Sequence, residues 1–178
     1  MKYFRNFVAE KLVIMILDKS TSEKKMRRMA MEIAERNHDK SSLILIGIKE
    51  NGIFIAEKIA ELLKPNFAGD IDVIELSMDK RNPGEIVLSK SIDFNGKSVL
   101  LIDDVANSGS TMLYAMKPLL EFHPAQIETV ILVERTHKKF PVAVNYVGLS
   151  VATTQQENII VEVESGIVSK AYIVNTSH

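Results

Sequence analysis

One segment in the middle of the chain, residues 99–111, constrains the fold more than any other. It begins with the apolar run Val99–Ile102, continues with the adjacent acids Asp103 and Asp104, and ends in a small polar loop. An apolar run of this length is typical of a strand that is buried on both faces, as in a parallel sheet. Apolar residues at helical spacing follow the loop. We therefore expect a strand, a polar loop and a helix in direct succession.

The polar loop has the composition of a phosphate-binding site. It consists of Ala106, Asn107, Ser108, Gly109, Ser110 and Thr111. The glycine lets backbone N–H groups approach an anion, the hydroxyl groups add donors, and the start of a helix presents the favourable end of its dipole. The two preceding carboxylates would repel phosphate but accept hydrogen bonds from sugar hydroxyls. These features predict a site for a ribose 5-phosphate unit, with simple helix capping beside a solvated strand end as the alternative.

Strand-like and helix-like patterns alternate along the rest of the chain. Apolar runs predict strands over 43–48, 71–76, 127–133, 142–147 and 159–163, with 86–88 as a candidate edge strand. Helical spacing predicts helices near 26–34, 53–63 and 112–120, the first after a capping-box pattern at Ser20–Glu23 and the last shortened by Pro118. This alternation indicates an α/β fold whose mainly parallel sheet carries helices on both faces. Without repeats or linkers, residues 1–178 are expected to form a single domain.

The composition excludes several kinds of site. The chain has 22 Lys and Arg against 23 Asp and Glu, a net charge of −1, so no global charge favours nucleic acid or an anionic membrane. It has no Cys, which excludes disulfides, thiolate metal ligands and cysteine nucleophiles. The apolar run Leu12–Leu17 is too short to cross a bilayer. We therefore expect a cytoplasmic protein without a membrane segment.

Residues 99–111 closely resemble the signature of type I phosphoribosyltransferases, in which an apolar strand leads to two acids and a Thr/Ser-Gly-x-Thr loop. Other segments resemble one branch, the pyrimidine operon regulator, which is a bifunctional RNA-binding attenuator and uracil phosphoribosyltransferase. They are Leu45–Ile53, which is similar to its diphosphate loop, and Leu132–His137 with Pro141 and Tyr146–Gly148. The similarity runs from about Leu17 to Val163. Hypoxanthine-guanine phosphoribosyltransferase is the next most similar family.

The resemblance implies a fold, ligands and a mechanism. The fold would be the type I phosphoribosyltransferase fold, with a flexible loop over 77–84 that closes on the site and a small hood. The ligand would be 5-phosphoribosyl diphosphate (PRPP), bound by the polar loop Ala106–Thr111, called the phosphate loop below, by the catalytic acids Asp103 and Asp104, and by the diphosphate loop Lys49, Glu50, Asn51 and Gly52. Mg²⁺ would be held mainly through the substrate, assisted by the two acids. Relatives form dimers or tetramers, so a homo-oligomer is expected.

Several positions depart from the family patterns. Where the regulator usually has Thr-Arg-Gly, this chain has Glu50-Asn51-Gly52, so an amide replaces an arginine, and Glu50 would oppose diphosphate if it pointed inward. Asn107 replaces an aspartate that purine enzymes use as a proposed general base, and an amide cannot take up a proton at neutral pH. Glu134 replaces the lysine that purine enzymes aim at the base carbonyl. Both changes disfavour a purine, although Ala152–Thr154 also departs from the regulator's Pro-Thr-Ser.

Two functions therefore remain open. The first is a Mg²⁺-dependent transferase of phosphoribose to a nucleobase, a pyrimidine such as uracil in the first instance, with Glu134, Arg135, His137 and Val147 on the base or hood side. The second is a nucleotide-sensing, RNA-binding regulator with little or no catalysis. Arg135, Lys138 and Lys139 could contact RNA, although a solvated loop explains them as well. The densest basic cluster consists of Lys24, Lys25, Arg27 and Arg28, and its alternation with methionines indicates the outer face of a helix.

Overall fold

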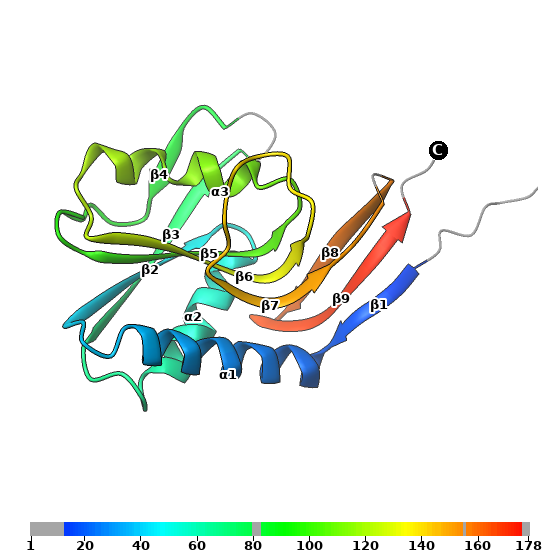
Figure 1. Cartoon of the computed structure of the whole chain (residues 1–178), viewed down its shortest axis with the longest axis horizontal. Helices are drawn as coiled ribbons and strands as arrows, with labels where there is room; N and C mark the ends of the chain where they lie inside the picture. Colours follow the sequence, from blue (N-terminus) through cyan, green and yellow to red (C-terminus); the bar gives the residue numbers. More distant parts are fainter. Residues whose placement is uncertain (1–12, 80–82, 155, 176–178) are drawn as a thin grey trace, which may run out of the picture.

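A six-stranded sheet in the order β4-β3-β2-β5-β6-β7 forms the centre of the computed structural model, which describes residues 13–79, 83–154 and 156–175 (Figure 1). All neighbouring strands are parallel except β3 and β4. This confirms the expected mainly parallel sheet and the edge strand. The strands are β2 (Ser42–Ile48), β3 (Asp70–Met78), β4 (Ile86–Leu88), β5 (Ser98–Ala106), β6 (Gln126–Arg135) and β7 (Tyr146–Val151).

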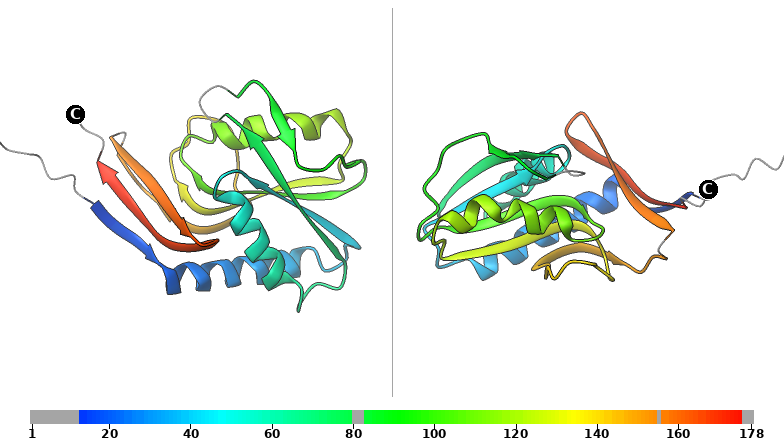
Figure 2. Two further views of the ribbon diagram at one scale, coloured as in Figure 1. Left: turned by 180° about the vertical axis from the view of Figure 1, so that it is seen from behind. Right: turned by 90° about the horizontal axis from the view of Figure 1, so that it is seen from above.

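Helices cover both faces of this sheet, as expected. The long helices α1 (Lys19–Arg36) and α2 (Gly52–Leu63) lie on one face, and the short α3 (Ser110–Ala115) with the 3₁₀ helix η1 (Lys117–Glu121) lies on the other (Figure 2). Successive residues of a strand point to opposite faces, so β2 contributes Leu45 to the α1–α2 side and Ile46 to the α3 side. Each such buried side chain stabilises the fold by about 1.5–3 kcal/mol.

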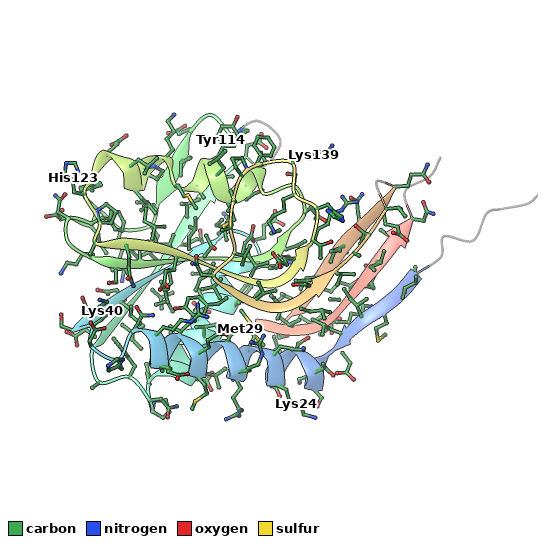
Figure 3. The ribbon with its side chains drawn as sticks, in the orientation of Figure 1. Lys24, Met29, Lys40, Tyr114, His123 and Lys139 are labelled. Atoms are coloured by element: carbon green, nitrogen blue, oxygen red, sulfur yellow. The ribbon has the colours of Figure 1, made fainter. Side chains whose placement is uncertain are left out.

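The sequence pattern correctly predicts the apolar stripe of α1 but not the residue at which the helix begins. Met29 lies between the helix and the sheets, whereas Lys24 projects from the outer side (Figure 3). The helix starts at Lys19, and its N-cap is Asp18, whose Oδ1 accepts a hydrogen bond from the Thr21 N–H at 2.7 Å. The Ser20–Glu23 pattern therefore lies inside the first turn and does not cap the helix. The shortening at Pro118 is confirmed, because α3 gives way to η1 there.

A second sheet of three antiparallel strands, β1-β9-β8, stands beside the first and is called the hood below (Figure 1). Its strands are β1 (Val13–Asp18), β8 (Glu157–Glu164) and β9 (Ile167–Asn175). Only β8 was predicted as a strand. Buried residues of β8 and β9, among them Val161 and Ala171, pack with α1 and α2 in one continuous core. The hood is therefore fastened to the helices that cover the central sheet.

Three expected boundaries differ in the structure. The strand predicted over 142–147 is wrong in its bounds, since β7 begins at Tyr146 and Val142 fills the α3 side of the core from a loop. The strand before the polar loop is longer than expected, because β5 continues through both acids to Ala106. Of the loop expected over 77–84, Ser77 and Met78 belong to β3, and residues 80–82 lie outside the described part of the chain.

A buried polar cluster joins the end of α1 to β6 and β7. The Tyr146 hydroxyl lies 3.1 Å from both carboxylate oxygens of Glu128, and Asn37 Nδ2 donates to the same hydroxyl at 3.2 Å. Burial, followed by the negative charge of Glu128, raises the pKa of Tyr146 to about 12. The phenol is therefore kept neutral so that it can donate to the carboxylate.

This cluster predicts a loss of stability at alkaline pH. Because the tyrosine of the unfolded chain ionises near about pH 10, Tyr146 contributes stability fully below that pH. The contribution is lost as pH rises toward the folded pKa of about 12. Urea unfolding between pH 8 and 11 should show a falling free energy of unfolding. Tyr146→Phe should flatten this decline and cost about 1–3 kcal/mol at neutral pH.

The exposed Tyr114, on the surface of α3, provides the matched control (Figure 3). Tyr114→Phe should leave both the stability at neutral pH and its alkaline decline unchanged. An equal alkaline decline in wild type and Tyr146→Phe would show that Tyr146 is not its source.

Candidate active site

The acidic pair lies at the carboxyl end of β5, in the middle of the central sheet, where open α/β sheets bind ligands. Asp103 is 1% exposed and Asp104 9% exposed. The Asp104 N–H donates to Asp103 Oδ1 at 2.9 Å, and the Val105 N–H donates to Asp104 Oδ1 at 2.8 Å. Local backbone donors therefore orient both carboxylates.

A cavity of about 270 Å³ opens directly beside this pair. One wall is the chain from the acidic pair to the start of α3, and the opposite wall is the hood strand β8. The residues that line it are Asp103, Asp104, Val105, Ala106, Asn107, Ser108, Gly109, Thr111 and Met112 on one side, and Ile159, Ile160 and Val161 on the other. The structure thus brings together the acids and the phosphate loop, and it places the hood strand β8, which the sequence predicts as a strand but not as part of the site, along the cavity.

The phosphate loop makes a tight turn just before α3. Gly109 has φ +83°, a left-handed conformation that favours glycine, and it immediately precedes α3. Because α3 has only six residues, its dipole adds little, and backbone N–H groups and hydroxyls would provide the hydrogen-bond donors to an anion. The Asn107 Oδ1 atom is buried with no hydrogen-bond partner among the described residues. A ligand with an N–H group could satisfy it.

The segment after β6 supports the phosphate loop from outside. The backbone N–H groups of Lys139 and Phe140 both donate to the Ser108 carbonyl at 3.0 Å. The Lys138 Cδ atom would lie 3.6 Å from a Cβ atom placed on Gly109. Lys139 itself projects from the top of the loop between β6 and β7 (Figure 3). The phosphate loop is therefore held between the sheet and residues 138–140.

The candidate diphosphate loop follows β2 and approaches the acidic pair closely. The peptide bond between Lys49 and Glu50 is cis. Asn51 Nδ2 donates to Asp104 Oδ2 at 2.8 Å and to the Val161 carbonyl at 3.0 Å. A Cβ atom on Gly52 would lie 2.6 Å from the Ile102 carbonyl oxygen, so only glycine allows this approach to β5. The amide that replaces arginine thus binds one of the two acids.

Lys49 and Glu50 lie outside the cavity beside Asp103 and Asp104. Both are exposed, and they line a separate, open depression with residues of β3 and β4. Two unit charges at 4 Å interact by only about 1 kcal/mol in bulk water, compared with about 4 kcal/mol near a low-dielectric surface. The acid at position 50 therefore opposes a bound anion only weakly in this conformation.

Glu134 forms a compact charged group at the end of β6. Its Oε2 accepts from Lys138 Nζ at 2.7 Å, and its Oε1 accepts from Ser150 Oγ at 2.7 Å. The Glu134 and Lys138 side chains are only 16% and 14% exposed. Lys138, for which the sequence indicates only a solvated or RNA-facing loop, packs beside the phosphate loop. A four-residue spacing brings two side chains together only in a helix, and residues 134–138 are not helical, so the sequence carried no signal for this pair.

The other residues predicted on the base side do not line the cavity. Arg135 donates to the Thr154 carbonyl, and His137 is exposed. Val147 is the second residue of β7, and its carbonyl accepts from Arg28 of α1. Arg28 also bonds Glu32, so one member of the basic cluster on α1 is already engaged within the protein.

The described residues also limit what else the site can contain. Within them, His, Asp and Glu side chains form no group of three that could hold a metal ion. Two adjacent carboxylates suit a hard cation such as Mg²⁺ that takes most of its ligands from substrate oxygens and water. None of the helices that the structure describes has the length and apolarity needed to span a lipid bilayer.

Comparison with known proteins assigns the class. The model of the phosphoribosyl transferase domain matches residues 13–165. The hypoxanthine phosphoribosyltransferase of Trypanosoma cruzi superposes with a TM-score of 0.75 over 91% of this chain and 96% of its own, at 15% identity. A hypoxanthine-guanine phosphoribosyltransferase of Bacillus anthracis gives 0.68 over 93% and 99%, at 19% identity. Fold and family model together define a type I phosphoribosyltransferase.

Curated relatives narrow this class. The bifunctional protein PyrR of Pediococcus pentosaceus is 38% identical over 156 residues, which cover 81% of this chain and 88% of the relative. The bifunctional protein PyrR of Enterococcus faecalis is 35% identical over 158 residues, which cover 84% and 89%. The chain belongs to the PyrR family of phosphoribosyltransferases, which confirms the resemblance seen in the sequence.

Proposed function

We propose that this phosphoribosyltransferase binds PRPP in the cavity beside Asp103 and Asp104 and transfers its phosphoribosyl group to a pyrimidine base such as uracil. The observation that carries the proposal is the shared cavity of the phosphate loop and the acidic pair. Donors of residues 106–111 would hold the 5-phosphate, and the two carboxylates would accept hydrogen bonds from the ribose hydroxyls.

The reaction would be a displacement at the anomeric carbon. A nitrogen of the base forms the new bond to this carbon as the bond to diphosphate breaks, and the base loses its proton. Positive charge develops on the ribose, next to the carboxylates of the acidic pair. Mg²⁺, when bound with the donor, would neutralise charge on the leaving diphosphate. Glu134 and Lys138 lie beside the phosphate loop, where they would border the base.

The features of the base pocket favour a pyrimidine. Asn107 cannot act as the general base that the purine mechanism uses, but its amide can pair with adjacent N–H and C=O groups of a base. The Asn107 Oδ1 atom has no partner among the described residues, so an N–H of the base would give it one. A lactam edge, as in uracil, offers both groups.

The experiment is diphosphate release from PRPP and Mg²⁺ across a panel of nucleobases that includes uracil, hypoxanthine and guanine. Release with uracil, and little or none with the purines, is expected. Release with a purine alone would reject the pyrimidine assignment. Silence with every base from folded protein would reject turnover and leave donor binding to be measured directly.

A second function, nucleotide-dependent RNA binding, is favoured by the resemblance to the pyrimidine operon regulator and by relatives that are named bifunctional. Lys24 and Arg27 are exposed on α1 and could contact phosphates. RNA affinity that falls steeply with salt, and that changes when nucleotide is added, would support this function. We also propose a cytoplasmic location and a homodimeric or tetrameric state. Sedimentation at several protein concentrations would test the oligomeric state.

A further inference from the structure

Asn51 connects three separate parts of the protein. It lies between β2 and the first residue of α2. Its Nδ2 atom donates to Asp104 Oδ2 in β5 at 2.8 Å and to the Val161 carbonyl in the hood strand β8 at 3.0 Å. These two hydrogen bonds are called the Asn51 bridge below. An amide nitrogen has two hydrogens, so both are used.

The bridge fixes the carboxylate of Asp104 from one side. Asp104 Oδ1 accepts from the Val105 N–H, and Asp104 Oδ2 accepts from Asn51. A donor on each oxygen sets the plane of the carboxylate group. Because the carboxamide is neutral, it orients the carboxylate and leaves its negative charge in place. An arginine at this position would cancel that charge. The remaining lone pairs of Asp104 stay available to a ligand.

The bridge also joins the two walls of the cavity. Asp104 belongs to the wall formed by β5 and the phosphate loop, and Val161 belongs to the opposite wall formed by β8. The bridge therefore sets the separation of these walls at the point where the acidic pair faces the hood.

We propose that Asn51 is a positioning residue for the donor site: it orients Asp104 and holds β8 in place across the cavity. The proposal deepens the proposed function and rests on it, because the ligand that Asp104 faces is taken to be the ribose of PRPP. Asn51 itself acts through Asp104 and Val161.

The first test compares Asn51→Ala, Asn51→Asp and a matched control in a steady-state assay. Asn51→Ala should raise the KM for PRPP about tenfold, the loss expected for a hydrogen bond to a charged group, and should lower kcat less than threefold. Asn158→Ala removes an exposed asparagine from the same hood strand and should change neither constant.

Asn51→Asp separates positioning from space filling. It keeps the shape of the side chain but removes both donors and sets a second negative charge against Asp104. It should therefore raise the KM for PRPP further than Asn51→Ala, by about another tenfold. Wild-type KM in Asn51→Asp would mean that the side chain only fills space, which overturns the proposal.

Hydrogen exchange of the ligand-free protein tests the link to the hood without depending on the donor. In Asn51→Ala the amides of β8 should exchange faster, while those of the buried strand β2 should not. Unchanged exchange in β8 overturns the proposal. If wild type bound no PRPP while β8 still loosened in the variant, the proposed function would fall and the link between β2 and the hood would stand.

Discussion

Replacing Asp104 with asparagine is expected to weaken PRPP binding about 10- to 100-fold while leaving the fold intact. Each charge-assisted hydrogen bond lost to a ribose hydroxyl is worth about 1.5–3 kcal/mol, and about 1.4 kcal/mol corresponds to a factor of ten. The fold should survive because the asparagine oxygen can still accept from the Val105 N–H, and only the hydrogen bond from Asn51 Nδ2 is lost.

Calorimetric titration with PRPP and Mg²⁺ measures this loss, and thermal unfolding checks the fold. Asp72→Asn, a change at an exposed aspartate of β3, is the matched control and should bind PRPP as wild type does. If the affinity of Asp104→Asn equals that of wild type, Asp104 does not contact the donor and the site must be placed elsewhere in the cavity.

Gly52→Ala is expected to destabilise the protein by about 3 kcal/mol, in the upper range of losses from overpacking. The added Cβ atom would lie 2.6 Å from the Ile102 carbonyl oxygen and 3.1 Å from Asp103 Cα. Both are backbone atoms of the central strand β5, which parallel neighbours hold on each side. A rotamer change therefore cannot relieve the contact.

Helix propensity alone would predict that Gly52→Ala stabilises the protein, which is the opposite of the expected result. Gly52 is the first residue of α2, and alanine there should favour the helix by up to about 1 kcal/mol. Urea unfolding gives the net effect, with Glu57→Ala at an exposed position of the same helix as the control, expected within about 0.5 kcal/mol of wild type. A stabilised Gly52→Ala would show that α2 can move away from β5, and that the close approach does not fix the site.

The sequence predicts the local parts of this protein well. The strand, acidic pair and phosphate loop around Gly109 are read from one contiguous segment, because apolar runs and turn residues act over short distances. The mainly parallel sheet follows from the alternation of strands and helices. The strand predicted over 142–147 has the wrong bounds because Val142, a loop residue, fills a core position as a strand residue would.

Contacts between distant segments could not be predicted. In the sequence, Asn51 is notable only because the family usually has an arginine at this position. Its hydrogen bonds to Asp104 and Val161 exist only in the folded chain. Lys138 reads as part of a solvated basic loop, yet its side chain is paired with Glu134 beside the phosphate loop. In both cases the role of the side chain depends on partners that sequence spacing alone does not identify.

The pairing of the hood has a consequence for the order of folding. In the hood, β1 pairs with β9, so Val13 lies opposite Val174 and Asp18 opposite Lys170. Pairing two strands from opposite ends of the sequence closes a very long loop, which is entropically costly and slow compared with the formation of local contacts. The central sheet, complete at Val151, can assemble earlier during synthesis than the hood. We therefore expect the cavity wall formed by β8 to be added last, to a phosphate loop and an acidic pair that are already in place.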